Sequence, residues 1–302
     1  MKHAFQFLAA GIVTTGLVLA GCGQHPEHAG RPTNSAPANT NLTIYQVKGV
    51  LKEIRAGGAK ALIAHEDIPG YMEAMTMQFD VKDTNELRGL LPGDPLTFRM
   101  LVTETDGWID QVKRIGVSAS PVAAAASKTN AFDEIEVGVP VPDCVLTNQL
   151  GQTIRFRDFK GRALAFTFIF TRCPFPTFCP RMSNNFGEAQ RRLLAETART
   201  NWHLISISFD PEFDTPTRLA EYAQTYHQDS AHWSFATGTT EDVRKLGGAF
   251  GLAFWREGAL FNHNVRTVVV DAAGRVQKVF ADNEWKPEQL AEEMKRAMEV
   301  EP

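Results

Sequence analysis

The sequence predicts two domains of different class, a small all-β domain followed by an α/β domain. Residues 42–117 hold short segments of alternating polar and apolar residues separated by turns, which is typical of an antiparallel sheet. Residues 133–302 hold continuous apolar segments that alternate with amphipathic helical patterns, which predicts β–α–β units. With 302 residues, the chain is long enough to build a separate core in each domain.

Composition excludes some classes of protein. The formal net charge is −4 and the sequence contains no long basic run, so we do not expect a nucleic-acid partner. The chain has four cysteines, too few for a disulfide scaffold but enough for one structured site. They are Cys22, Cys144, Cys173 and Cys179.

The N-terminus indicates export. The apolar segment from Ala4 to Ala20 is too short for a comfortable membrane span, and it ends in the sequence Leu-Ala-Gly-Cys at Cys22. That ending resembles the bacterial lipobox. The resemblance implies that residues 1–22 are a lipoprotein signal peptide, that Cys22 is lipidated, and that the remainder lies on the extracytoplasmic (periplasmic) side of a bacterial membrane. Residues 23–41 are rich in Pro, Ala, Asn and Thr, which indicates a disordered tether.

The all-β domain is expected to contain five strands and one short helix. Five short strands within a domain of this size favour a small closed barrel. The expected strands lie near residues 44–51, 59–65, 75–81, 96–104 and 108–115, and the helix near residues 84–90.

A methionine cluster is the chemical feature of this domain. Met75 and Met77 are two residues apart on an expected strand, so both side chains lie on one face. Met72 is close by, and His65 ends the preceding strand. Thioether sulfurs are soft and uncharged and prefer Cu(I) or Ag(I) to Zn(II). The alternative is that the methionines only fill the core, although their density favours a site.

Residues 65–79 resemble the metal-binding segment of the CusF-like periplasmic copper-binding domains. The resemblance implies an OB-like barrel in which His65, Met75 and Met77 bind Cu(I). Those domains place a tryptophan three residues before the first methionine, where this chain has Met72. Met72 is therefore a candidate further ligand or a shield of the metal.

Residues 118–132 are mostly small residues without an apolar period and predict a flexible linker. In the α/β domain that follows, two cysteines lie in a proline-rich loop between a buried strand and a helix. A cysteine loop at the end of the first central strand, with a terminal hairpin and helix, predicts a thioredoxin-like arrangement. Strands are expected at residues 144–147, 153–156, 164–170, 203–209, 233–235, 265–270 and 276–280, and helices at 184–197, 215–226, 240–250 and 287–298.

The loop contains Cys173 and Cys179. Backbone N–H groups and the helix dipole favour thiolate at this position, so the pair is suited either to a disulfide or to a soft metal. A plain structural disulfide is the alternative. Cys144 is expected to be buried and inert.

Three segments of this domain resemble the Sco/SenC family. They are the cysteine loop, the segment Ser-Phe-Asp-Pro-Glu-Phe-Asp-Thr-Pro that contains Asp210, and Asn-His-Asn around His263. The resemblance implies a thioredoxin fold that binds copper through Cys173, Cys179 and His263 and serves the CuA centre of cytochrome c oxidase subunit II. Asp210 is then a candidate partner of the ligands. The family usually has three residues between its cysteines, and this chain has five.

The sequence thus favours a membrane-tethered copper chaperone, not an enzyme, that relays Cu(I) from the methionine site across the flexible linker to the cysteine site. The alternative is a thiol-disulfide oxidoreductase that acts on the cysteines of a copper acceptor, which needs the cysteine pair but not His263. A copper-storage or resistance lipoprotein is a third hypothesis.

Overall fold

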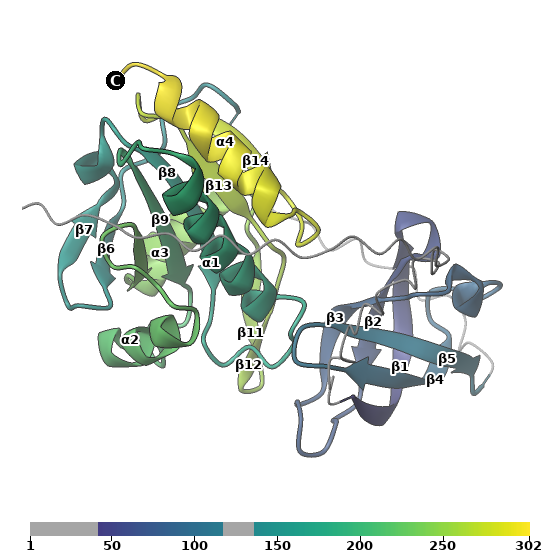
Figure 1. The fold of residues 1–302 in the computed structure, drawn as a ribbon. Coiled ribbons are helices and arrows are strands. Elements are labelled where there is room, and N and C mark those ends of the chain that lie inside the picture. Colours follow the sequence, from purple (N-terminus) through teal and green to yellow (C-terminus); the bar gives the residue numbers. More distant parts are fainter. Residues whose placement is uncertain (1–41, 117–135) are drawn as a thin grey trace, which may run out of the picture. The chain divides into compact units, whose positions relative to one another are not determined.

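A computed structural model describes residues 42–116 and 136–302 (Figure 1). Both described ranges fall within a single contact unit of the chain. The predicted signal peptide, Cys22, the tether and the linker lie outside the described residues. Within the two described ranges, no helix has the length and apolar character needed to cross a membrane.

The first described range is all-β, as predicted. Its antiparallel sheet has the strand order β3-β2-β1-β4-β5. Alternation of apolar and polar residues along each strand sends one face of the sheet into the domain core. The strands are β1 (Thr43–Arg55), β2 (Lys60–His65), β3 (Met75–Asp80), β4 (Pro95–Val102) and β5 (Gly107–Arg114).

The prediction of a closed, OB-like barrel is not confirmed. Strands β3 and β5 are the two edge strands of the hydrogen-bonded sheet. Closing the barrel would require β3 to pair with β5, but among the described residues only an isolated bridge between Val81 and Ile109 joins these two edges. Strand β3 already ends at Asp80. Within β5, Gln111 has a left-handed φ of 50°, at the point where the pairing register with β4 shifts. The expected helix near residues 84–90 is a single 3-10 turn, Thr84–Leu87.

The α/β domain contains a mixed seven-stranded sheet with the order β14-β13-β8-β9-β10-β6-β7. Strands β8, β9 and β10 are parallel neighbours at its centre, and the terminal hairpin β13–β14 pairs antiparallel with β8. This arrangement confirms the predicted α/β class. The strands are β6 (Val145–Asn148), β7 (Thr153–Arg155), β8 (Ala163–Ile169), β9 (Trp202–Ser208), β10 (Trp233–Thr237), β13 (Thr267–Val270) and β14 (Val276–Phe280).

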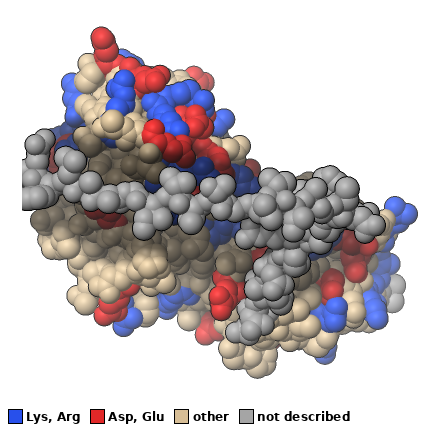
Figure 2. Space-filling model, viewed as in Figure 1, with Lys and Arg blue, Asp and Glu red and all other residues tan. Residues whose placement is uncertain are grey.

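Four helices accompany this sheet. They are α1 (Cys179–Glu196), α2 (Pro216–Thr225), α3 (Thr240–Ala249) and α4 (Pro287–Glu299). Helices α1 and α4 lie side by side over β8 (Figure 1). Ion pairs such as Arg192–Glu288 at 2.5 Å and Lys295–Glu196 at 2.6 Å join their exposed faces, and Figure 2 shows basic and acidic side chains intermixed there. A 3-10 turn, Phe156–Phe159, precedes β8.

The predicted start of the helix after the cysteine loop was wrong. Helix α1 begins at Cys179, five residues before the predicted start. Pro180 is tolerated in the first helical turn, because the N–H that proline lacks would have no partner there. The segment before His263, for which the sequence predicts no element, is a two-stranded hairpin of β11 (Phe254–Glu257) and β12 (Leu260–His263), with Gly258 and Ala259 at its turn.

Candidate metal-binding sites

The structure brings Cys173, Cys179 and His263 together. Buried strand β8 places the cysteine loop at its carboxyl end, and β12 ends at His263. One ligand atom of each residue lies within 4.8 Å of the others, and the distance from Cys179 Sγ to His263 Nε2 is 4.0 Å. Two sulfurs and one imidazole nitrogen in a triangle match the low coordination number and the soft donors that Cu(I) prefers.

The imidazole of His263 is held in one orientation. Its Nδ1 donates to the carbonyl oxygen of Asn264 at 2.8 Å, which turns Nε2 toward Cys179. The rings of Phe170, Phe178 and Phe209 surround the imidazole, with centroids 5.7, 5.7 and 5.1 Å away. This apolar wall limits water at the ligands and restricts rotation of the ring.

The two thiols differ in acidity. Both cysteines are free in the structure, Cys179 buried and Cys173 half-buried. Burial raises the pKa of Cys173, but hydrogen bonding to Cys179 and His263 outweighs burial, so its pKa lies well below that of an ordinary thiol. Burial and the neighbouring Cys173 thiolate raise the pKa of Cys179 well above its ordinary value. The pair therefore holds one proton, on Cys179, and one thiolate, on Cys173. This state is suited to nucleophilic attack or to metal binding.

Buried carboxylates fix the start of the cysteine loop. Asp214 accepts hydrogen bonds from the backbone N–H of Thr171 at 3.0 Å and from the hydroxyl of Ser208 at 2.5 Å. Asp210 has no exposed surface and forms ion pairs with Arg172 at 2.7 Å and Arg256 at 3.3 Å. The predicted partner role of Asp210 therefore takes the form of an anchor for the residue that precedes Cys173.

Sequence reasoning missed Asp214 and the β11–β12 hairpin that supplies Arg256. The Asp214 carboxylate lies in the family-like segment Ser-Phe-Asp-Pro-Glu-Phe-Asp-Thr-Pro, of which sequence reasoning singled out only Asp210. The hairpin had a usable sequence signal, because a glycine at the first position of a two-residue turn, as in Gly258-Ala259, favours a β-hairpin. In the structure Gly258 has the positive φ, 62°, that such a turn requires.

In the all-β domain, His65 ends β2 and pairs across the sheet with Met75, the first residue of β3. Its Nδ1 donates to the carbonyl oxygen of Glu66 at 2.7 Å. Its Nε2 is buried and has no hydrogen-bond partner. Burial also lowers the pKa of His65, which keeps the ring neutral. A buried imidazole nitrogen with a free lone pair is uncommon, and a metal ligand is one physical explanation.

The three methionines are nearly inaccessible. Met72 is 5% exposed, and Met75 and Met77 are each 7% exposed. Met72 and Met77 pack within the core of the all-β domain, so the core-filling alternative accounts for part of their role. All three nevertheless line one cavity, which leaves their sulfurs a shared space.

Cys144 is buried, as predicted, and His203 is a second buried group away from the candidate copper ligands. Cys144 is 6% exposed, and burial raises its pKa to about 11. His203 is buried on β9, where Nε2 and the hydroxyl of Ser234 are 2.9 Å apart, and burial lowers its pKa to about 4. Neither residue belongs to the cysteine–histidine triangle.

Known proteins resemble both domains. A family model described as copper binding periplasmic protein CusF matches residues 44–114, and the SCO1/SenC model matches residues 140–299. A SCO1 protein homolog of Bacillus subtilis is 35% identical over 94 residues, which are 31% of this chain and 47% of that protein. A SCO2-like protein of Rickettsia felis is 26% identical over 174 residues, covering 53% of this chain and 78% of that protein.

Among solved structures, a SCO1/SenC family lipoprotein of Bacillus anthracis matches with a TM-score of 0.49 and 26% identity, over 54% of this chain and 96% of that one. The chain spans about half the length of the Bacillus subtilis relative. The SCO1/SenC model covers more than half of the chain, in the domain that carries Cys173, Cys179 and His263. The chain therefore belongs to the SCO1/SenC family, with a CusF-like domain preceding the family domain.

Proposed function

We propose that this protein is a copper chaperone that binds Cu(I) through Cys173, Cys179 and His263 and delivers it to a copper acceptor. The observation that carries the proposal is the triangle of two sulfurs and one imidazole nitrogen within 4.8 Å, inside an aromatic enclosure. Three donors suit Cu(I), whereas Zn(II) normally takes a fourth ligand. Membership of the SCO1/SenC family supports copper as the cargo.

The second part of the proposal is an accessory Cu(I) site in the all-β domain, made by His65, Met75 and Met77 with Met72 as a further ligand or shield. Its support is the unpartnered Nε2 of buried His65 beside Met75, together with the CusF match.

Three features of the proposal rest on the family and on the N-terminal sequence. The acceptor is the CuA centre of cytochrome c oxidase subunit II. The location is extracytoplasmic, which fits the match to a periplasmic copper-binding protein. The anchor is lipid on Cys22, with residues 1–22 as signal peptide, 23–41 as tether and 118–132 as linker between domains at 42–117 and 133–302.

A thiol-disulfide oxidoreductase is the second candidate, because the acidity of Cys173 beside a protonated Cys179 also suits thiol exchange. In this alternative the pair cycles between the free thiols and a Cys173–Cys179 disulfide, and copper insertion falls to another protein. The geometry favours the chaperone, since a reductase needs no imidazole with its lone pair directed at a cysteine.

The test is an anaerobic titration of the purified chain with Cu(I) against a chromogenic chelator. We expect two equivalents to bind, one lost in Cys173→Ser/Cys179→Ser and the other in Met75→Leu/Met77→Leu. A Cys144→Ser variant is the matched control and should keep both equivalents. If the cysteines fail to compete with the chelator and form a readily reduced disulfide instead, the chaperone proposal is wrong and the reductase stands.

A further inference from the structure

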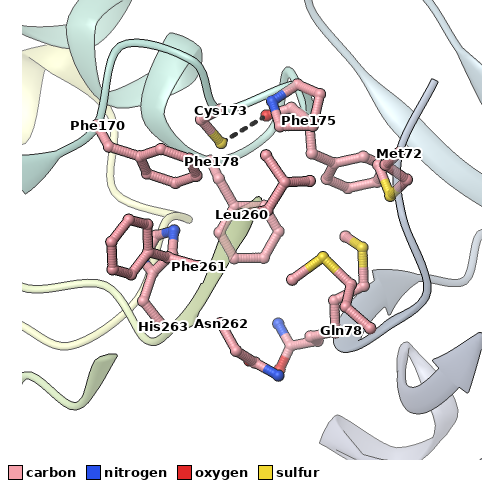
Figure 3. Close-up of a pocket in the computed structure, with 13 residues that line it drawn as sticks. Met72, Gln78, Phe170, Cys173, Phe175, Phe178, Leu260, Phe261, Asn262 and His263 are labelled. Atoms are coloured by element: carbon pink, nitrogen blue, oxygen red, sulfur yellow. Dashed lines mark hydrogen bonds between the residues drawn. The ribbon is translucent and has the colours of Figure 1, made fainter. Parts of the chain in front are cut away.

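Residues of both proposed copper sites line the same cavity. Met72, Met75 and Met77 of the all-β domain line it together with Cys173 and His263 of the α/β domain. The remaining lining is largely aromatic and aliphatic, including Phe170, Phe175, Phe178 and Leu260. Figure 3 shows Met72, Cys173 and His263 around this cavity. Thioether, thiol and imidazole donors thus border one space whose lining is largely apolar.

The cysteine loop itself makes the first contact between the domains. Phe175, two residues after Cys173, is 3% exposed and belongs to the core of the all-β domain, where its ring centroid lies 6.0 Å from that of Phe79. The hydroxyl of Tyr71 donates to the carbonyl oxygen of Pro174 at 2.9 Å. Gly107 provides room for this insertion, because a Cβ there would lie 3.0 Å from the Phe175 ring.

The insertion gives the unusual cysteine spacing a role. The five residues between Cys173 and Cys179 include Phe175, and the loop is long enough to reach a neighbouring core while both sulfurs still meet His263. The extra length therefore does not open the metal triangle. It connects that triangle to the domain that holds the methionines.

The β11–β12 hairpin makes the second contact. Thr76, which lies between Met75 and Met77 on the end strand β3, donates its N–H to a carboxylate oxygen of Glu257 at 3.3 Å. The side-chain amide of Asn262 donates to the carbonyl oxygen of Thr76 and to Glu257. Asn262 immediately precedes His263 in β12. The cysteine loop and the β12 strand, which carry the ligands of one proposed site, are thus both hydrogen-bonded to the part of the all-β domain that carries the methionines.

From these contacts we propose that the cavity is a transfer chamber, in which Cu(I) passes from the methionine thioethers to Cys173, Cys179 and His263 without entering bulk water. The inference rests on the proposed function, since it requires both copper sites. In this proposal the domains do not need to diffuse on a flexible linker, because the ligands exchange while the domains are docked. The docking is held by the packing of Phe175 and by the hydrogen bond from Asn262 to Thr76.

The exchange involves no change of oxidation state. Bonds from Cu(I) to the thioether sulfurs and to Nε2 of His65 break one at a time as bonds to the Cys173 thiolate and to Nε2 of His263 form. The proton of Cys179 leaves to water as that thiol binds. Thiolate donors hold Cu(I) more tightly than thioethers because they carry charge, so the direction of transfer is from the methionines to the cysteines.

The experiment separates a protected route from release into solvent. The purified chain is oxidised so that Cys173 and Cys179 form a disulfide, loaded with one equivalent of Cu(I), and freed of excess metal. A phosphine reductant is then added together with a strong Cu(I) chelator as a trap. The thiolate-to-copper absorption reports metal at the cysteines, and the chelator colour reports metal that escaped.

In the unaltered protein we expect most of the copper to reach the cysteines. Phe175→Ala and Asn262→Ala should each increase the trapped fraction about tenfold, because loss of docking lowers the effective concentration of the receiving ligands. Glu284→Gln is the matched control. It removes an ion pair between the same two domains, Lys60–Glu284 at 2.8 Å, whose residues do not line the cavity, and it should behave as the unaltered protein.

Equal trapping in all four proteins, with both equilibrium affinities intact, would overturn the chamber while leaving the two copper sites standing. Failure of the unaltered protein to bind Cu(I) at either site would instead overturn the proposed function, and the chamber with it. Circular dichroism checks that each variant folds. Should Phe175→Ala be unfolded, Asn262→Ala decides the result, because that residue contributes hydrogen bonds at an edge and no core volume.

Discussion

The two candidate sites use the same imidazole geometry with different sulfur donors. His65 and His263 each donate Nδ1 to the carbonyl oxygen of the following residue, at 2.7 and 2.8 Å. In both rings Nε2 is the nitrogen left for another partner, directed in His263 toward Cys179. The sulfur groups beside His65 are neutral thioethers, whereas those beside His263 are thiols that can ionise. Under the proposed function, the sulfur chemistry sets the difference in copper affinity while the orientation of the histidine stays constant.

The difference also concerns protons. A thioether binds metal without losing a proton, but a thiol must ionise first. In the proposed relay, the thioether site would take up Cu(I) without releasing a proton. The thiolate site would then bind Cu(I) more tightly and release a proton as it does so.

Substituting His263 is expected to have the largest effect. His263→Ala should weaken Cu(I) binding at the cysteine site by at least about a hundredfold, because two thiolates without a third donor and its fixed orientation hold the ion less well. Competition with a chelator measures the loss. His203→Ala, at a buried histidine outside the triangle, is the control. If His263→Ala keeps the copper affinity of the cysteine site and still reduces disulfides at the unaltered rate, the protein is better described as an oxidoreductase than as a copper chaperone.

The pH dependence of binding should separate the sites next. Affinity at the cysteines should rise about tenfold per pH unit for each proton released between pH 6 and 8. Burial lowers the pKa of His65 below its ordinary value and thioethers carry no proton, so affinity at the methionine site should change less than at the cysteines. Below that range its protonation should weaken binding there too. Titrating each site separately at three pH values, in variants that lack the other, gives the slopes.

A steeper slope at the methionine site than at the cysteines would contradict the comparison. It would mean that a thiol, and not the thioethers with His65, dominates binding there. Cys144 is a poor candidate for that thiol, because it is buried and burial raises its pKa to about 11.

The smallest expected effect is on stability. Met75→Leu/Met77→Leu preserves hydrophobic volume, so the free energy of unfolding should fall by less than about 1.5 kcal/mol for each residue. Copper binding to the all-β domain should nevertheless be lost. Denaturant unfolding of the metal-free protein makes the measurement. A much larger destabilisation would indicate that these methionines serve mainly as core, as Met77 partly does.

Much of the fold was predictable from local sequence. The alternation in Met75–Asp80 and the uninterrupted apolar sequence of β8 define a half-buried and a fully buried strand before any tertiary contact is known. The position of the cysteine loop between β8 and α1 followed from the same pattern. Residue type alone also named the sulfur and imidazole donors, because soft-metal chemistry depends on the donor atom.

Tertiary structure decided the rest. That His263 meets Cys179, 84 residues away, with Nε2 toward it, depends on the β11–β12 hairpin and on a backbone carbonyl. That Phe175 belongs to the core of another domain is invisible in a loop with no period. Local patterns report which face of an element is apolar. They do not report which surface covers it, since that choice is made by packing between segments distant in the chain.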